Sequence, residues 1–198
     1  MKKNLSGIVL AGGKNTRMGK KKSFLEVENY RLIDKILGVY HEIFSEIIIV
    51  TNDPLFYTEF ASAVIVSDIY KDKGALGGIY TGLFFASHNH SFIAACDMPF
   101  LNKDFIIYLT EQADKYDIVV PKLSEGFQPL HAIYSKNCLP VIKRHLLADK
   151  LKITSFYKEL RVFPVPEERI KPFNEDGRLF LNINTPGELE VIREKTDP

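Results

Sequence analysis

Three things are scarce in this 198-residue sequence: cysteine, an excess of charge of either sign, and long apolar runs. Two cysteines, Cys96 and Cys138, are too few for a disulfide framework and lack metal-site spacing, so we expect a reducing cytoplasm. The balance of 26 basic and 25 acidic residues argues against broad nucleic-acid binding. No run reaches about eighteen apolar residues, which argues against a membrane span. The glycine pair after Ala11 ends the stretch in which a secretion signal would continue.

What the sequence does contain is a regular alternation of two apolar patterns. Apolar runs of strand length cover residues 7–11, 47–51, 64–67, 92–96 and 118–121. Between them apolar residues recur at helical spacing, as in Leu32, Ile36 and Leu37. This alternation predicts a doubly wound α/β fold, with a mostly parallel sheet and helices on both faces. Residues 129–134 and 161–165 are predicted as further strands and 185–195 as a final helix. No linker or repeat divides the chain, so we expect a single domain over residues 1–198.

A glycine-rich and basic loop, LAGGKNTRMGKKKSF over residues 10–24, follows the first predicted strand. Gly12 and Gly13 let the backbone approach an anion closely, Arg17 can bind phosphate through its planar fork, and a lysine supplies a mobile charge. The loop therefore predicts a polyphosphate cradle, with a tight turn and solvated lysines as the alternative. It matches neither GxxxxGK[ST] nor GxGxxG, which argues against a P-loop NTPase and a dinucleotide oxidoreductase.

A carboxylate follows the fourth predicted strand, in ACDMPF over residues 95–100. Ligands of such sheets bind beyond the carboxyl ends of the strands. Mg²⁺ prefers one or two carboxylates together with substrate phosphates, so we predict Asp97 as a metal ligand. The alternative is an Asx turn or an N-cap before a helix that starts near Asn102.

Other polar and glycine residues are expected at the same edge. Asn52 follows the second predicted strand and Asp68 the third; a carboxylate accepts two hydrogen bonds, which suits the neighbouring N–H donors of guanine. The alternative for Asp68 is a turn former. The stretch GALGG at residues 74–78, which includes Gly77, precedes an apolar helix predicted over 79–87. Its amides are predicted to be free for a phosphate, ribose or base, unless the glycines only make a tight turn.

Two features of the second half complete the set. In LNINTPGEL, residues 181–189, Thr185 and Pro186 are typical of a helix start, and the segment is expected to join a strand to that helix. Asn182 and Asn184 stand at alternate positions, so they are predicted to face the same way and to supply oxygens to a metal or an acceptor. His131 lies in a strand-like run and is expected to be a satisfied core or rim histidine rather than a catalyst.

Taken in order, the motifs LAGGxxxRMGxxK, GALGG, ACDMPF, PLHAIY and NINTPxEL resemble those of the molybdenum cofactor guanylyltransferases, from Leu10 to Leu189. The resemblance implies a Rossmann-like nucleotidyltransferase fold and transfer of GMP from GTP to the terminal phosphate of molybdopterin, with release of pyrophosphate. Two departures stand out. Lys21 precedes Lys22 where the family has an acidic residue, so which of the lysines at 20–22 contacts the phosphates stays open. Asn29-Tyr30-Arg31 replaces the family's Gly-Lys-Pro.

Residue patterns and resemblance together assign the following roles: catalysis to Arg17, Lys22 and Asp97; Mg²⁺ to Asp97; GTP binding to Leu10, Ala11, Gly12, Gly13, Lys22, Asn52, Asp68 and Gly77; and contact with the acceptor or the metal to Asn182 and Asn184. The resemblance also implies transient contact with molybdoenzymes or cofactor chaperones, without nucleic acid or membrane. Two alternatives remain, a cytidylyltransferase acting on molybdopterin or a sugar phosphate, and a nucleotide-binding module without catalysis.

Overall fold

The computed structural model describes residues 3–12, 22–27 and 30–183, and its centre is an eight-stranded sheet with the order β10-β7-β9-β6-β1-β4-β5, to which β8 is added beside β7. The strands of this sheet are β1 (Lys3–Leu10), β4 (Phe44–Val50), β5 (Val64–Val66), β6 (His90–Ala95), β7 (Ile118–Leu123), β8 (Gly126–Phe127), β9 (His131–Ser135) and β10 (Val162–Pro166). A separate antiparallel pair is formed by β2 (Glu26–Val27) and β3 (Tyr30–Arg31). The helices are α1 (Leu32–Ile43), α2 (Gly74–Phe85), α3 (Lys103–Thr110), α4 (Cys138–Leu147) and α5 (Glu167–Ile170).

The sheet is mostly parallel, as predicted. Strand β1 runs parallel to β4 and β6, β4 parallel to β5, and β7 parallel to β10. Strand β9 is inserted antiparallel between β6 and β7. The carboxyl ends of β5, β4, β1 and β6 therefore meet at one edge of the sheet, called the carboxyl edge below, and β7 and β10 end at the same edge.

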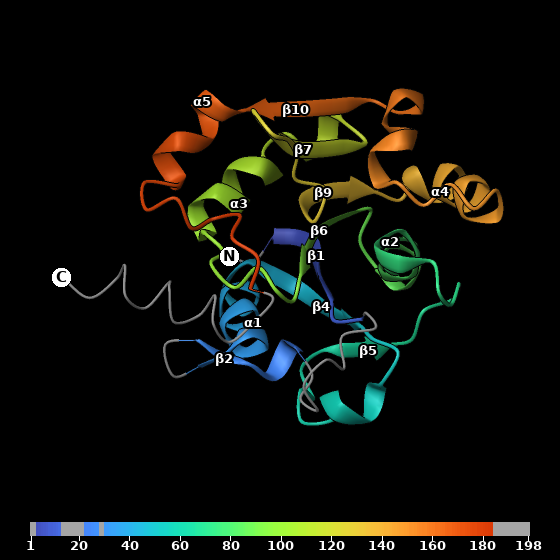
Figure 1. The fold of residues 1–198 in the computed structure, drawn as a ribbon, viewed down its shortest axis with the longest axis vertical. Helices are drawn as coiled ribbons and strands as arrows, with labels where there is room; N and C mark the ends of the chain where they lie inside the picture. Colours follow the sequence, from blue (N-terminus) through green and yellow to red (C-terminus); the bar gives the residue numbers. More distant parts are fainter. Residues whose placement is uncertain (1–2, 13–21, 28–29, 184–198) are drawn as a thin grey trace.

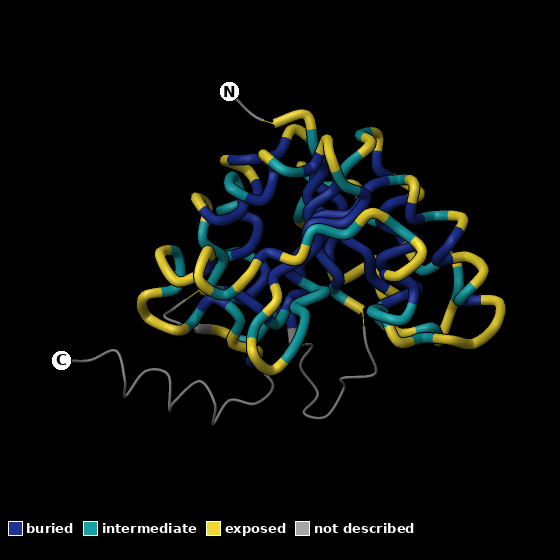
Figure 2. The backbone as a smooth tube through the Cα atoms, turned by 90° about the horizontal axis from the view of Figure 1, so that it is seen from above, coloured by how far each residue is buried: buried dark blue, intermediate teal, exposed yellow. Residues whose placement is uncertain are grey.

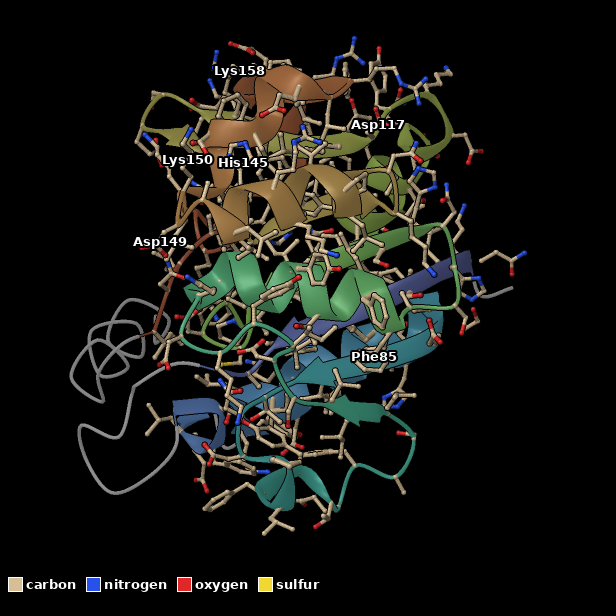
Figure 3. The ribbon with its side chains drawn as sticks, turned by 90° about the vertical axis from the view of Figure 1, so that its right-hand side faces the viewer. Phe85, Asp117, His145, Asp149, Lys150 and Lys158 are labelled. Atoms are coloured by element: carbon tan, nitrogen blue, oxygen red, sulfur yellow. The ribbon has the colours of Figure 1, made fainter. Side chains whose placement is uncertain are left out.

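Helices cover both faces of the sheet, which confirms the predicted α/β class (Figure 1). On one face α1 and α3 enclose a core that contains Tyr40, Phe92 and Phe105. On the other, α2 and α4 lie side by side over a core that contains Ile79 and Leu146 (Figure 3). Because both faces are covered, the central strands are buried along their length, and exposed residues are concentrated in the loops (Figure 2).

Helix α2 packs closely on β1 at a glycine. A Cβ built on Gly82 would lie 2.6 Å from Cγ2 of Ile8, which is fully buried. We expect Gly82→Ala to lower the free energy of unfolding by about 1–3 kcal/mol, because the added methyl group overpacks this contact. The matched control is Gly38→Ala in α1, where a Cβ would meet nothing within 4 Å. The control should leave stability unchanged or raise it by up to about 1 kcal/mol. Urea unfolding of both variants tests this, and equal effects would contradict it.

The boundaries predicted for the helix at 79–87 are wrong. The stretch at residues 74–78 is not a loop before a helix at 79–87 but the first turns of α2, which ends at Phe85. The glycines serve close packing there: a Cβ on Gly77 would lie 3.0 Å from the backbone oxygen of Tyr70, and one on Gly78 would lie 3.2 Å from Cδ2 of Leu10. Residues 181–183 form no strand. The helix predicted over 185–195 lies outside the described residues.

Cys96 and Cys138 are both buried, and they are not joined in a disulfide. In the described part of the chain, no helix is long and apolar enough to cross a membrane.

Candidate functional site

Backbone hydrogen bonds hold the loops together just beyond the carboxyl edge. The amide of Ala11 donates to Val50 O at 2.8 Å, and that of Thr51 to Val66 O at 2.9 Å. The amide of Cys96 donates to Leu10 O at 3.0 Å. The sheet pattern thus continues one residue past each strand and fixes where the next side chains project. Open α/β sheets bind their ligands at this place.

Three of the predicted residues come together on the β5 side of this edge. The side-chain amide of Asn52 donates to Asp68 Oδ2 at 2.9 Å. A Cβ on Gly12 would stand 3.9 Å from both Asn52 Nδ2 and Asp68 Oδ2. Gly12 is exposed and has no side chain that could cover the pair. The first, second and third predicted strands therefore deliver one glycine, one amide and one carboxylate to a common patch.

Asp68 holds the distinctive polar atom of this patch. Burial raises the pKa of its carboxyl group, while the hydrogen bond from Asn52 and the nearby Thr81 hydroxyl act in the opposite direction. Oδ1 is buried and accepts no hydrogen bond from any described residue, because the Thr81 hydroxyl donates to Gly77 O at 2.9 Å instead. It lies on the side of Gly78, where an added Cβ would be 3.8 Å away. A buried acceptor without a donor is costly, and a ligand N–H would remove that cost.

Gly77 does not offer the free amide that was predicted for it. It is buried inside α2, and its N–H donates to Lys73 O at 3.3 Å. Lys73, the residue that precedes α2, forms an ion pair with Asp149 in the loop after α4, with Nζ 2.9 Å from Oδ1 (Asp149 is labelled in Figure 3). Gly77 therefore contributes close packing at this edge, and its place in a GTP site stays a prediction.

Asp97 lies in a tight turn after β6, near the middle of the carboxyl edge. The turn is closed by the amide of Met98, which donates to Ala95 O at 3.1 Å. The alternative of an N-cap for Asp97 is wrong: helix α3 is capped by Asn102, whose Oδ1 accepts from Phe105 N at 3.0 Å. The half-buried carboxylate of Asp97 is thus not used to begin the helix.

The segment with the asparagine motif lies beside Asp97. The amide of Ile183 donates to Asp97 O at 2.8 Å, and the Ile183 side chain is buried against Leu32. Asn182 is exposed next to this contact. The role predicted for Asn182, contact with a metal or the acceptor, stays a prediction. Asn182 and Asn184 were predicted to face the same way because alternate residues of a strand do so, but residues 181–183 are not a strand. Asn184 lies outside the described residues.

The glycine-rich loop over residues 10–24 lies mostly outside the described residues, including Gly13 and Arg17, and so does the side chain of Lys22. The two ends of this loop are linked through the hydroxyl group of Tyr57, a contact that the sequence analysis did not predict. The hydroxyl of Tyr57 donates to Ala11 O at 3.3 Å, and the Ser23 hydroxyl lies 2.6 Å from the same Tyr57 oxygen. Burial raises the pKa of Tyr57 to about 12. No local pattern predicts this link, because the partners are far apart in the chain.

The donor set suits a magnesium ion that arrives with phosphate. Among the described residues, no three His, Cys, Asp or Glu side chains cluster as a complete metal site. Asp97 provides one carboxylate at the strand end, and Asn182 is exposed next to Ile183, whose amide is hydrogen-bonded to Asp97 O. Mg²⁺ usually binds one or two carboxylates and completes its shell with water and substrate phosphate. The residues present therefore fit Mg²⁺ bound together with a nucleotide.

His131 is buried, as expected, but it is not satisfied. Its side chain is 0% exposed, and neither ring nitrogen has a hydrogen-bond partner among the described residues. The ring packs against Phe92, Phe105 and Phe180, with centroid distances of 5.2, 5.7 and 5.1 Å. Burial lowers its pKa to about 3. The histidine is therefore a neutral core residue at neutral pH.

A doubly wound sheet with a glycine turn, an amide–carboxylate pair and an acidic turn at its carboxyl edge defines the class of nucleotide-binding α/β domains. The chain belongs to the MobA-like NTP transferase domain family, whose model matches residues 7–162.

Individual relatives agree with this assignment. The chain is 39% identical over 188 residues to a molybdenum cofactor guanylyltransferase from Desulfosudis oleivorans, covering 94% of this chain and 93% of the relative. It is 37% identical over 191 residues to a probable molybdenum cofactor guanylyltransferase from Pelotomaculum thermopropionicum, with 95% and 91% covered. The crystal structure of molybdopterin-guanine dinucleotide biosynthesis protein A from Archaeoglobus fulgidus is similar with a TM-score of 0.81 and 27% identity, covering 96% of this chain and 98% of that one.

Proposed function

We propose that this chain transfers GMP from GTP to the terminal phosphate of molybdopterin, releasing pyrophosphate and forming a guanine dinucleotide. The observation that carries the proposal is the patch of Gly12, Asn52 and Asp68, in which a buried carboxylate oxygen lacks a donor. The names of the relatives supply the acceptor and the reaction.

Asp68 is the proposed reader of the base. Guanine presents two neighbouring N–H donors on its pairing edge, and a carboxylate can accept both. Cytosine presents an amino group beside an acceptor nitrogen, and that nitrogen would face the carboxylate unfavourably. The hydrogen bond from Asn52 to Oδ2 holds the carboxylate in one orientation. This arrangement favours GTP over CTP and therefore the guanylyltransferase over the cytidylyltransferase alternative.

The phosphates are held by the loop after β1 in this proposal. The amides of Gly12 and Gly13, the fork of Arg17 and the charge of Lys22 neutralise the triphosphate and the departing pyrophosphate. Both substrates are anions, so charge neutralisation and in-line alignment carry the catalysis, and no covalent intermediate on the protein is needed. Asp97 would hold Mg²⁺, with Asn182 and Asn184 toward the metal or the acceptor. When bound, the ion supplies Lewis-acid stabilisation of phosphate oxygens.

Asp68→Asn tests the base assignment. The new side chain keeps an oxygen for Asn52 but turns an amide donor toward the donors of guanine. We expect GTP to bind roughly 10- to 100-fold more weakly, because a charge-assisted hydrogen bond is lost and a donor is left opposed. Titration calorimetry with GTP and ATP measures this, with the exposed neighbour Ser67→Ala as the control. Unchanged GTP affinity in Asp68→Asn would remove Asp68 from base recognition.

The reaction itself is tested by measuring pyrophosphate release when purified protein is given Mg²⁺, molybdopterin and one of GTP, CTP, ATP or UTP. The product is identified by mass spectrometry. Release with GTP alone and a guanine dinucleotide product are expected. Release with CTP would keep the reaction and overturn the base. Tight GTP binding without release would favour the module that binds nucleotides without catalysis.

A further inference from the structure

A hollow lies at the carboxyl edge, away from the Asp68 patch. It has a volume of about 290 Å³, and its walls include Leu123 at the end of β7, Glu167 and Ile170 of α5, and Phe180 and Leu181. The segment after α5 runs from this helix across the edge of the sheet toward α1 (Figure 1). Two residues beyond Leu181, Ile183 is hydrogen-bonded to Asp97 O. The wall of the hollow therefore continues directly into the Asp97 turn.

The hollow is lined by the aromatic ring of Phe180, which contacts with other rings hold in place. The ring of Phe180 packs edge-on against Phe105, at a centroid distance of 6.2 Å and an interplanar angle of 86°, and against His131, at 5.1 Å and 71°. A flat ring that enters the hollow would meet the Phe180 ring, with polar wall residues such as Lys171 and Asn174 beside it.

A carboxylate is also fixed in this wall. Glu167 Oε2 accepts a hydrogen bond from the backbone amide of Ser124 at 3.2 Å, which holds the group against the end of β7. No described residue donates to Glu167 Oε1, and Oε2 has a second lone pair. The hollow thus combines a fixed ring face with an oriented acceptor, as a site for a planar heteroaromatic ligand requires.

The order of the strands places this hollow on the other side of Asp97 from the Asp68 patch. Asp68 follows β5, Asp97 follows β6, and Leu123 ends β7. In the order β7-β9-β6-β1-β4-β5, Asp97 therefore lies between the hollow and the Asp68 patch. It is two strand spacings from β7 and three from β5. At about 4.8 Å per spacing, the two ring sites are on the order of 14 and 10 Å from the β6 position along the edge. A dinucleotide with its phosphates at the centre would place one ring on each side.

We propose that the hollow lined by Glu167 and Phe180 binds the pterin ring of the acceptor, an inference that rests on the proposed function. The pyrimidinone half of a pterin carries an amino group beside a ring N–H, a pair of donors that a carboxylate accepts. Glu167 receives these donors, and Phe180 packs against the ring. The terminal phosphate of the acceptor then extends along residues 181–183 to the Asp97 turn.

The test uses 6-hydroxymethylpterin, whose fluorescence reports binding to the full chain. Glu167→Gln turns an amide donor toward the ring while its oxygen keeps the Ser124 contact. We expect roughly tenfold or weaker pterin binding in this variant, because a hydrogen bond to a charged group is lost. The control is Glu168→Gln, an exposed neighbour in α5 that does not line the hollow, and it should bind pterin as the wild type does. GTP affinity should stay within about twofold of wild type in both variants, since Asp68 is untouched.

Four outcomes overturn the pterin assignment: equal pterin binding in Glu167→Gln and wild type, no pterin binding by the wild-type chain, displacement of pterin by GTP without Mg²⁺, or an unchanged KM for molybdopterin in Glu167→Gln. Failure of the proposed function gives a different result. In that case pterin binding depends on Glu167, but GTP with molybdopterin yields no pyrophosphate.

Discussion

Asp97→Ala is expected to reduce pyrophosphate release from GTP and molybdopterin by roughly a thousandfold or more, because the electrostatic stabilisation of phosphate oxygens is the largest contribution to this kind of reaction. The carboxylate is half-buried at the end of β6, near the centre of the carboxyl edge. Two hydrogen bonds hold the local backbone: Ile183 N donates to Asp97 O, and Met98 N donates to Ala95 O. Both are backbone hydrogen bonds, which alanine makes as well, so we expect the turn to persist in the variant.

The measurement combines single-turnover pyrophosphate release with thermal unfolding and a GTP titration in Mg²⁺. The matched control is Asp104→Ala, an exposed aspartate in the first turn of α3, which should keep wild-type turnover. Loss of turnover with an unchanged melting temperature assigns the effect to the site. Near-normal turnover in Asp97→Ala would remove this carboxylate from the mechanism and would leave the phosphate loop to act without it.

The central strands could be predicted because they are covered on both faces. Burial on both sides requires apolar side chains at every position, and the runs at 47–51 and 118–121 show this directly. The direction of β9 could not be predicted, since an apolar run looks the same in a parallel and an antiparallel strand. The start of α2 was missed for another reason: its glycines have low helix propensity, and close packing on Tyr70 and Leu10 decides their conformation.

The site was predictable where a residue directly follows a strand. Gly12, Asn52 and Asp68 could be grouped because the carboxyl ends of parallel strands meet, and the hydrogen bond from Asn52 to Asp68 confirms that the last two are neighbours. The link between Tyr57 and Ser23 depends on packing between distant segments and has no local signal. The roles of Arg17 and Lys22 rest on loop chemistry and family resemblance, and they stay predictions.

Acidification should destabilise the chain through His131. Its pKa in the folded protein is about 3, against about 6.5 for an exposed histidine, so between these values the unfolded state binds a proton that the folded state does not. Above pH 6.5 the ring is neutral in both states and the contribution is constant. As the pH falls from 6.5 to 3, the free energy of unfolding decreases by about 1.4 kcal/mol per pH unit, or about 2 kcal/mol by pH 5.

His131→Leu removes this titration while keeping an apolar side chain among Phe92, Phe105 and Phe180. We expect the variant to match or exceed wild-type stability at pH 7, since two unpaired buried nitrogens disappear. Between pH 7 and pH 5 the variant should lose about 2 kcal/mol less than the wild type in urea unfolding. His41→Leu, at an exposed position in α1, should keep the wild-type pH slope. Equal slopes in wild type and His131→Leu would mean that the His131 ring is protonated in the folded chain, with a partner such as a buried water supporting its charge.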